Sequence, residues 1–189
     1  MFDIAIVGAG PAGASAAIFA AKAGKKTILI DNEKTSIGRA LLKNYPGIKE
    51  ITGSDLVNTV QEQAVSFGTE LVQDSVTNIR KEAEGFVIET ENREPIQSKQ
   101  VILATGMITK LADPLGLKTK PGTEPFIKTI FEVDESGKTN IEGIWAAGIC
   151  AGVSFHTIIA AGDGARVAIN VISELNGERY MDHDALPKK

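Results

Sequence analysis

The sequence predicts an α/β protein built on a parallel sheet, and three consecutive segments support this. Residues 3–8, DIAIVG, are an apolar run with β-branched residues that ends in glycine, as buried parallel strands do. Residues 11–24 are Ala-rich, begin with Pro11 and end with Gly24, which are typical first and last positions of a helix. Residues 26–31, KTILID, are a second apolar strand. Together they predict a β-α-β unit.

The middle of the chain predicts one more helix and a group of strands. Residues 34–50 look irregular and contain the turn NYPG. Residues 52–68 carry apolar side chains at helical spacing and end in glycine, which predicts a helix. Residues 70–104 read mostly as strands separated by natural turns. We expect these strands to form a small antiparallel β-layer packed beside the parallel sheet.

The last part of the chain predicts a loop, two strands and a long helix. Residues 107–125 hold three prolines and two glycines without clear periodicity, which is typical of a linker-like loop. Strands are expected in 126–134 and 142–148, on either side of a turn. An Ala-rich amphipathic helix is expected over about 156–175.

The composition fits one domain over residues 1–189 and excludes several partners. The chain is 43% hydrophobic and 23% charged. Its net charge of −4 and pI near 5.3 give no electrostatic basis for binding nucleic acid or an anionic membrane. Asp3 lies where a signal peptide carries basic residues, and no segment reaches membrane-spanning length. We therefore expect a cytoplasmic protein.

Cysteine and histidine are scarce. One cysteine excludes both an intramolecular disulfide and a Cys-x-x-Cys pair. With two histidines far apart in the sequence, no metal site is expected.

The segment GAGPAG carries the clearest chemical signal. Gly8, Gly10 and Gly13 have the spacing G-x-G-x-x-G, directly after a predicted strand and at the start of a predicted helix. The first glycine permits a tight turn, the second lets the backbone approach a diphosphate, and the third lets helix and strand pack closely. The helix N-terminus adds free N–H groups and a positive dipole end. Asp31 ends the second strand, where an acid accepts hydrogen bonds from a ribose. These features predict a dinucleotide, FAD or NAD.

Four segments carry a family resemblance that favours FAD. IAIVGAGPAGASAA, NYPG, VILATG and GIWAAG…AAGDGARVA follow one another in the order found in the thioredoxin reductase family of flavoproteins, and the chain resembles the FAD-binding domain of that family from end to end. The resemblance implies a Rossmann-like three-layer FAD-binding fold, with a parallel sheet and a small antiparallel β-layer. It also implies a homodimer, because family members pair through their FAD domains.

The resemblance also implies roles for individual residues. Residues 104–106 would approach FAD from a second strand end, Val76 would meet the adenine through a backbone amide, and Asn44 would lie in a turn near the flavin. The amides of His156 and Thr157 would face the pyrimidine side of the flavin ring. The candidate cofactor-binding residues are Gly8, Gly10, Pro11, Ala12, Gly13, Asp31, Asn32, Arg39, Asn44, Val76, Ala104, Thr105, Gly106, Gly148, Ile149, His156 and Thr157.

The sequence departs from the family pattern where a second domain is expected. The family inserts an NADPH-binding domain, with its own glycine fingerprint and a redox Cys-x-x-Cys, after the ATG segment. Here the loop 107–125 occupies that point and no second fingerprint occurs. Disulfide reduction by a cysteine pair of this chain is therefore not expected.

A further departure lies in the segment AAGI. The family pattern is A-A-G-D, whose aspartate hydrogen-bonds the ribityl chain of FAD, whereas this chain has Ile149. Loss of one such bond costs about 1–3 kcal/mol of binding free energy if a hydroxyl is left unpaired. Ile149 either weakens FAD binding or marks a site with a changed ligand.

The catalytic residues are not identified by the sequence, and His156 and Cys150 are the candidates. His156 could donate a proton near neutral pH or could simply cap a helix. Cys150 could be a reactive thiol or a small buried residue. Arg39 could lie near the cofactor or be solvated, and Asp163 is expected to pair with Arg166 at the surface.

The sequence supports two functional hypotheses. The first is a small FAD-dependent oxidoreductase or electron-transfer flavoprotein, with NAD(P)H or a redox protein as electron donor. The alternative is a non-catalytic module that binds or senses FAD or another dinucleotide.

Overall fold

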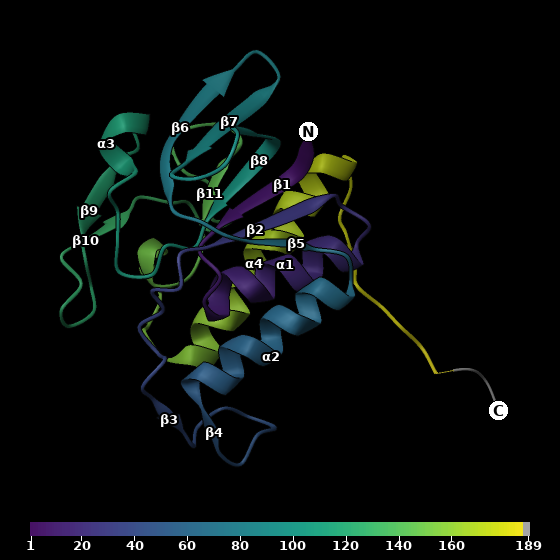
Figure 1. The fold of residues 1–189 in the computed structure, drawn as a ribbon, viewed down its shortest axis with the longest axis vertical. Coiled ribbons are helices and arrows are strands. Elements are labelled where there is room, and N and C mark those ends of the chain that lie inside the picture. The colour runs from purple at the N-terminus through teal and green to yellow at the C-terminus, as the bar shows by residue number, and fades with distance from the viewer. Residues whose placement is uncertain (187–189) are drawn as a thin grey trace.

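The computed structural model describes residues 1–186, and its framework is one seven-stranded sheet. The strands follow the order β5-β2-β1-β8-β7-β6, and β11 also pairs with β8. Figure 1 shows this sheet above three helices. The strands of the sheet are β1 (Phe2–Val7), β2 (Thr27–Asp31), β5 (Glu70–Gln73), β6 (Val76–Glu82), β7 (Gly85–Thr90), β8 (Ile96–Leu103) and β11 (Ile144–Ala146).

The centre of the sheet is parallel, which confirms the predicted α/β fold class. β1 lies between β2 and β8, and all three run in the same direction. β5 continues the parallel arrangement beside β2. The carboxyl ends of these strands therefore meet at one edge of the sheet, where ligands bind in open α/β folds.

The antiparallel strands join the parallel sheet through β8. The first half of β8 pairs with β7, with Ile96 opposite Ile88, and β7 pairs with β6. The second half of β8 pairs in parallel with β11, with Leu103 opposite Ala146. The expected antiparallel component is present, and it is hydrogen-bonded to the main sheet because β8 is shared between the two parts.

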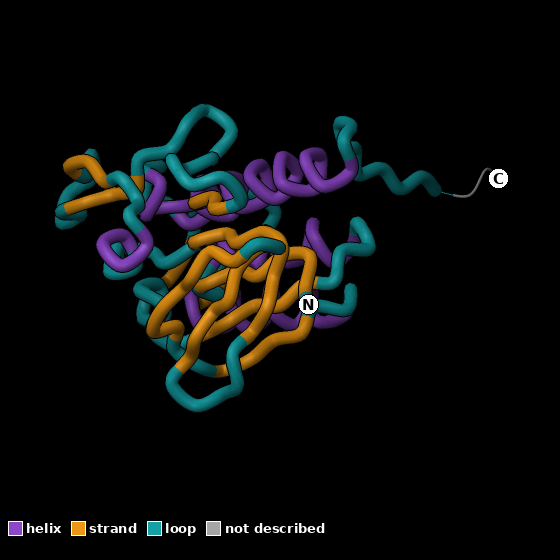
Figure 2. The backbone as a smooth tube through the Cα atoms, turned by 90° about the horizontal axis from the view of Figure 1, so that it is seen from above, coloured by secondary structure: helices purple, strands orange, loops and turns teal. Residues whose placement is uncertain are grey.

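Three helices cover one face of the sheet (Figure 1). They are α1 (Pro11–Lys22), α2 (Gly53–Ser66) and α4 (Thr157–Asn176), and they lie within a few residues of the predicted helices. A short 3₁₀ turn, Gly148–Ala151, connects β11 toward α4. Figure 2 shows the strands of the main sheet gathered in one group, with the β9–β10 strand pair apart from it, and residues 178–186 extending beyond α4.

The side chains of each central strand alternate between two hydrophobic cores. Ile4 and Ile6 of β1 pack against α1 and α4, whereas Ala5 and Val7 face the opposite core with β6 and β7. Successive side chains of a strand point to opposite faces, so a strand covered on both faces is apolar throughout. This explains the continuous apolar run in the first strand of the sequence.

The segment 107–125 contains regular structure, which corrects the expected linker-like loop. It holds the short helix α3 (Ala112–Leu115) and the strand β9 (Thr119–Pro121), which pairs with β10 (Thr129–Phe131). Leu111 and Leu117 anchor the segment because both are buried in the core on the β6–β7 side. Elements of three or four residues are too short to produce a periodic pattern in the sequence.

The region 34–50, expected to be irregular, contributes one strand of a small hairpin. β3 (Leu41–Leu42) pairs with β4 (Ile51–Thr52), and the NYPG turn lies between them. In Figure 1 this hairpin lies below α2, on the far side of the helices from the sheet. Over residues 1–186, no helix has the length and apolar character needed to cross a membrane.

Candidate functional site

A cavity of about 550 Å³ lies at the carboxyl edge of the parallel strands. Its walls come from the turn after β1, the end of β2, the turn after β8 and the turn after β11. This volume is within the range of about 300–1,000 Å³ that is usual for sites of small molecules and cofactors. The predicted dinucleotide fingerprint therefore opens into a cavity.

The three fingerprint glycines play different structural roles. A Cβ atom on Gly8 would lie 2.4 Å from the Ala104 carbonyl oxygen, and Gly8 has a φ of +100°. A Cβ atom on Gly13 would lie 1.7 Å from the carbonyl oxygen of Gly8. A Cβ atom on Gly10 would contact the protein only at Thr35 Oγ1, 3.6 Å away. Gly8 and Gly13 thus allow the backbone to pack, and Gly10 leaves space inside the cavity.

The N-terminus of α1 presents free backbone donors at this turn. Gly10 occupies the cap position, no side chain caps the helix, and Pro11 at the first helical position has no N–H. The first intrahelical bond runs from the Ala14 amide to the Gly10 carbonyl, so the amides of Ala12 and Gly13 have no helical partner. Such amides, with the positive end of the helix dipole, favour a phosphate or diphosphate.

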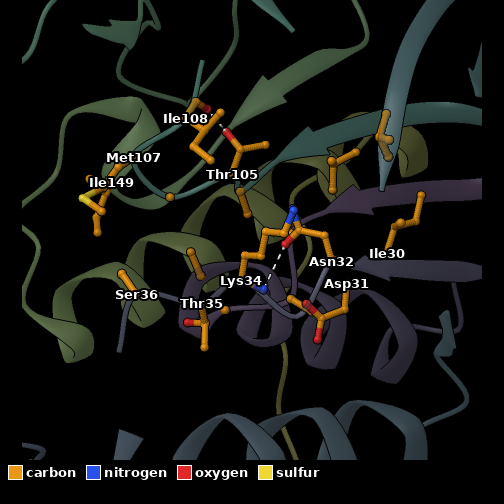
Figure 3. Close-up of a pocket in the computed structure, with 18 of the residues that line it drawn as sticks. Ile30, Asp31, Asn32, Lys34, Thr35, Ser36, Thr105, Met107, Ile108 and Ile149 are labelled. Carbon is orange, nitrogen blue, oxygen red and sulfur yellow. Dashed lines mark hydrogen bonds between the residues drawn. The ribbon is translucent and has the colours of Figure 1, made fainter. Parts of the chain in front are cut away.

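Asp31 lines the cavity at the end of β2, and its carboxylate is held on both oxygens. Oδ1 accepts a hydrogen bond from the Glu33 amide at 2.9 Å, and Oδ2 accepts one from Gln61 Nε2 at 2.9 Å. Figure 3 shows Asp31 and Asn32 at the edge of the cavity opposite Met107 and Ile149.

A second polar wall follows β5. Residues 74–77, including Val76, line the cavity. Asp74 is buried and accepts hydrogen bonds from the amides of Ser75 at 2.8 Å and Asn92 at 3.1 Å. These bonds fix the turn beside Val76, the residue expected to meet an adenine.

The opposite end of the cavity is apolar. Ile149 lines it together with Met107, Ile108 and Phe155. Met107 is 51% exposed and Phe155 is 49% exposed, although large apolar side chains are usually covered. This end would suit a flat, largely apolar ring better than a chain of hydroxyl groups.

Asp163 holds the glycine turn that follows β11. Its Oδ2 accepts a hydrogen bond from the Gly148 amide at 2.7 Å, and its Oδ1 pairs with Arg166 at 2.8 Å. The pairing with Arg166 is as expected, but the surface position is wrong because the Asp163 side chain is only 6% exposed. The carboxylate is buried because its position on α4 faces the turn at Gly148.

The N-terminus of α4 lies partly at the cavity. Thr157, its first residue, lines the cavity and is buried. His156 occupies the cap position, but its side chain makes no capping bond and is exposed. Its Nδ1 lies 2.7 Å from Ser154 Oγ, and its ring stacks on Phe155 with centroids 5.0 Å apart. The imidazole is therefore outside the cavity wall, whereas both neighbours contribute to that wall.

Cys150 is buried behind the turn. Its Sγ lies 3.3 Å from the carbonyl oxygen of Leu103 and 3.3 Å from that of Ala147, so its single S–H can donate to either. Burial raises the pKa of the thiol to about 11. A thiol that stays protonated and covered at neutral pH is a poor nucleophile. The geometry therefore favours a packing role.

The cavity brings together most of the candidate cofactor-binding residues. Those that line it are Gly8, Gly10, Pro11, Ala12, Asp31, Asn32, Val76, Ala104, Thr105, Gly106, Ile149 and Thr157. Gly13, Gly148 and His156 adjoin this wall in sequence without lining it. Arg39 and Asn44 are exposed elsewhere, and Asn44 lines a shallow surface hollow formed by 43–49 in the β3–β4 hairpin. Asn44 lies in the β3–β4 hairpin below α2, away from the cavity, and Arg39 lies two residues beyond Ile37, after the chain has left the cavity wall.

Several lining residues were not among those candidates. Most of them directly follow a predicted strand end, and this proximity was the available signal. They include Lys34, Thr35, Ser36, Ile37, Asp74, Ser75, Thr77, Glu91, Met107, Ile108, Lys110 and Phe155. Among residues 1–186, no group of three or more His, Cys, Asp or Glu side chains could hold a metal ion.

Comparison with known families identifies the group to which this sequence is related. The model of the pyridine nucleotide-disulphide oxidoreductase family matches residues 2–124. The chain belongs to this family.

Related sequences include thioredoxin reductases. The enzyme of Peptoclostridium acidaminophilum is 40% identical over 117 residues, which cover 59% of this chain and 36% of that protein. The enzyme of Treponema pallidum is 32% identical over 191 residues, covering 96% of this chain and 55% of that protein. The chain thus spans between 36% and 55% of the length of these two relatives.

Solved structures show the same fold. A thioredoxin reductase from Gloeobacter violaceus superposes with a TM-score of 0.84 at 18% identity, covering 98% of this chain and 99% of that one. The atypical thioredoxin reductase TRi from Desulfovibrio vulgaris Hildenborough gives a TM-score of 0.82 at 20% identity, covering 94% and 99%. At these identities the likeness concerns the fold. It agrees with the Rossmann-like FAD-binding architecture expected from the sequence.

Proposed function

We propose that this chain is a small FAD-dependent oxidoreductase or electron-transfer flavoprotein of the thioredoxin reductase-like type. The observation that carries the proposal is that one cavity collects the glycine turn, the uncapped start of α1, Asp31 and residues 104–106. Membership of an oxidoreductase family also supports an oxidoreductase function.

The chain's own groups suit the two halves of FAD differently. The free amides of Ala12 and Gly13 would bind the diphosphate, Asp31 would accept from the ribose, and the backbone near Val76 would meet the adenine. Residues 104–106 and the start of α4 at Thr157 would adjoin the flavin, whose two-electron chemistry the bound cofactor would supply. The positive end of α4 would stabilise negative charge beside it.

Electrons would have to enter and leave through separate molecules. A redox-active dithiol within the chain would require two cysteines. This sequence has one, which is buried, so the proposed flavin would exchange electrons with other molecules directly. We propose that NAD(P)H or a redox protein is the electron donor. Such a molecule would approach the exposed apolar end of the cavity, at Met107 and Phe155. In this proposal residues 1–189 are a single FAD-binding domain that pairs as a homodimer, and the segment 107–125 replaces the inserted NADPH domain.

Ile149 favours a second candidate function, a non-catalytic module that binds or senses a dinucleotide. Its side chain lines the cavity and has no hydrogen-bonding group. A polyhydroxyl chain passing this position would lose one partner there. Such a module would still bind the adenine-nucleotide part of FAD but would bind the flavin part more weakly.

The first experiment is to purify the full chain, record its visible spectrum and identify any released cofactor by chromatography after denaturation. Near-stoichiometric FAD, followed by bleaching of the flavin on addition of NADH, NADPH or a reduced redox protein, is the expected result for the oxidoreductase. A protein that holds FAD but is not reduced by any of these donors would support the binding module. A colourless protein that stays colourless with added FAD would overturn FAD binding.

A further inference from the structure

Gln61 connects the glycine turn to Asp31 from behind the cavity. It lies on α2, and its Nε2 donates to the Ala9 carbonyl at 3.0 Å and to Asp31 Oδ2 at 2.9 Å. Both partners accept hydrogen bonds only, so the amide nitrogen must face them, and its two N–H groups match the two acceptors. The side chain is partly buried, which limits competition from water.

The two groups that Gln61 holds are themselves part of the cavity wall. Ala9, between Gly8 and Gly10, and Asp31 both line the cavity, whereas Gln61 does not. Gln61 therefore cannot act on a ligand directly. It can act by fixing the distance and orientation of the carboxylate relative to the phosphate-binding turn.

The Asp31 carboxylate keeps free acceptor positions for a ligand after its hydrogen bonds within the protein are counted. A carboxylate has about four acceptor positions. The Glu33 amide occupies one on Oδ1, and Gln61 occupies one on Oδ2. About one position on each oxygen remains, which matches the two hydroxyl donors of a ribose cis-diol.

We propose that Gln61 is a positioning residue that orients Asp31 to bind the 2′- and 3′-hydroxyls of an adenosine ribose. This inference rests on the proposed dinucleotide site. It predicts that the contribution of Gln61 to affinity depends on those hydroxyls. A purely structural role would weaken the binding of ligands with and without them equally.

The test uses ADP and 2′,3′-dideoxy-ADP as probes, measured by titration calorimetry on the full chain freed of co-purified nucleotide. The variant Gln61→Met keeps the side-chain length and removes the donors. Gln63→Met, at an exposed position of the same helix, is the matched control. The wild type is expected to prefer ADP by about tenfold or more, and Gln61→Met should bind ADP about five- to tenfold more weakly with dideoxy-ADP changed less than about twofold.

A second variant guards against a folding defect. Gln61→Glu has the same shape but turns the donor into a negatively charged acceptor beside Asp31, so the preference for ADP should disappear. Thermal melts followed by circular dichroism establish that each variant is folded. Gln63→Met should retain the wild-type preference.

The failures of the two proposals can be told apart. A wild-type protein that binds neither ADP nor FAD overturns the dinucleotide site itself. A wild-type protein that binds ADP and dideoxy-ADP equally overturns the role of Asp31 toward the diol. Equal weakening of both probes by Gln61→Met and by Gln61→Glu assigns Gln61 a structural role and overturns the positioning role.

Discussion

Gly10 and Gly13 lie three residues apart, and the space available for a Cβ atom differs between the two positions. The Gly13 position has no room for a Cβ atom because the Gly8 carbonyl fills that space. The Gly10 backbone is extended, with a φ of −71°, and its Cβ direction is open. The Gly13 constraint therefore concerns folding, whereas the open side of Gly10 faces the cavity, where we propose that a phosphate binds.

This difference gives a paired prediction. Gly13→Ala should destabilise the protein by about 3 kcal/mol or more, because an overpacked backbone contact must be relieved. Gly10→Ala should keep the free energy of unfolding within about 1 kcal/mol of the wild type, yet should weaken FAD or ADP binding at least tenfold, because the methyl group would occupy the proposed phosphate site. Urea unfolding and calorimetry measure the two effects. Full ADP affinity in a folded Gly10→Ala variant would contradict the phosphate role of this turn.

Ile149 lines the cavity and offers a ligand no hydrogen-bonding group. Ile149→Asp should strengthen FAD binding by about fivefold, since one added hydrogen bond contributes on the order of 1 kcal/mol. Ile149→Leu, which adds no polar group, serves as the control and should leave the affinity unchanged. Fluorescence quenching of FAD measures both. Unchanged or weaker FAD binding by the Ile149→Asp variant would favour a changed ligand at this end of the cavity.

Cys150 predicts a specific pH dependence. Burial raises the thiol pKa to about 11, whereas an unfolded cysteine ionises near 9.0. The protonated form is thus favoured by folding, so the stabilisation is complete below pH 9 and is lost as the pH rises toward 11. The loss should be on the order of 2 kcal/mol. Chemical denaturation from pH 8 upward should show it in the wild type, and Cys150→Ala should lack that part of the decline.

At the scale of elements, α1 and α4 approach each other through small residues. A Cβ atom on Gly164 of α4 would lie 2.0 Å from the Ala12 carbonyl of α1. Buried alanines on α1 and α4 continue this contact. The close approach matters for the site because Ala12 also lines the cavity.

Gly162 and Gly164 provide a matched pair on one helix. Gly164→Ala should cost about 1–3 kcal/mol of stability because α4 must move away from α1. Gly162→Ala should gain about 0.5–1 kcal/mol, because this position is exposed and alanine favours the helix. Thermal denaturation distinguishes them. Equal effects at both positions would show that helix propensity, rather than the contact with Ala12, determines the result.

At the scale of the whole molecule, one sheet separates and connects two hydrophobic cores. Trp145 of β11 is fully buried in the core on the helix side, and its Nε1 donates to Gln100 Oε1 at 2.8 Å. Its neighbours Ile144 and Ala146 face the other core. Since each central strand contributes to both cores, neither core can be lost while the other stays intact.

The molecule should therefore unfold in a single transition. Trp145 fluorescence reports the helix-side core, and far-UV circular dichroism reports all helices and strands. Their urea midpoints should coincide, and saturating FAD at about 100 times its dissociation constant should add about 2.7 kcal/mol to both. An earlier loss of one signal would contradict the coupling of the two cores. A different FAD-induced shift of the urea midpoint for fluorescence than for circular dichroism would also contradict this coupling.

Much of the fold follows from local sequence patterns. The β-α-β unit and the last helix match the predicted bounds within a few residues, because each depends on neighbours in the chain. Pro11 fixes a helix start and Gly177, with a φ of +73°, ends one. The family resemblance supplied the expectation that residues 104–106 and Val76 converge on the same cavity.

The tertiary structure alone decided how distant residues meet. Gln61 contacts Asp31, 30 residues away in the sequence, and Asp163 contacts Gly148, 15 residues away. No periodic pattern in the sequence predicts either contact. Leu111 and Leu117 order a segment whose sequence resembles a linker, and the β3–β4 hairpin places Asn44 outside the cavity wall. The sequence by itself determined the α/β class and the glycine turn between β1 and α1, because strand and helix periodicity and a glycine-rich turn are local patterns. Which side chains complete the site depends on the packing of whole elements, and that packing is a property of the folded chain.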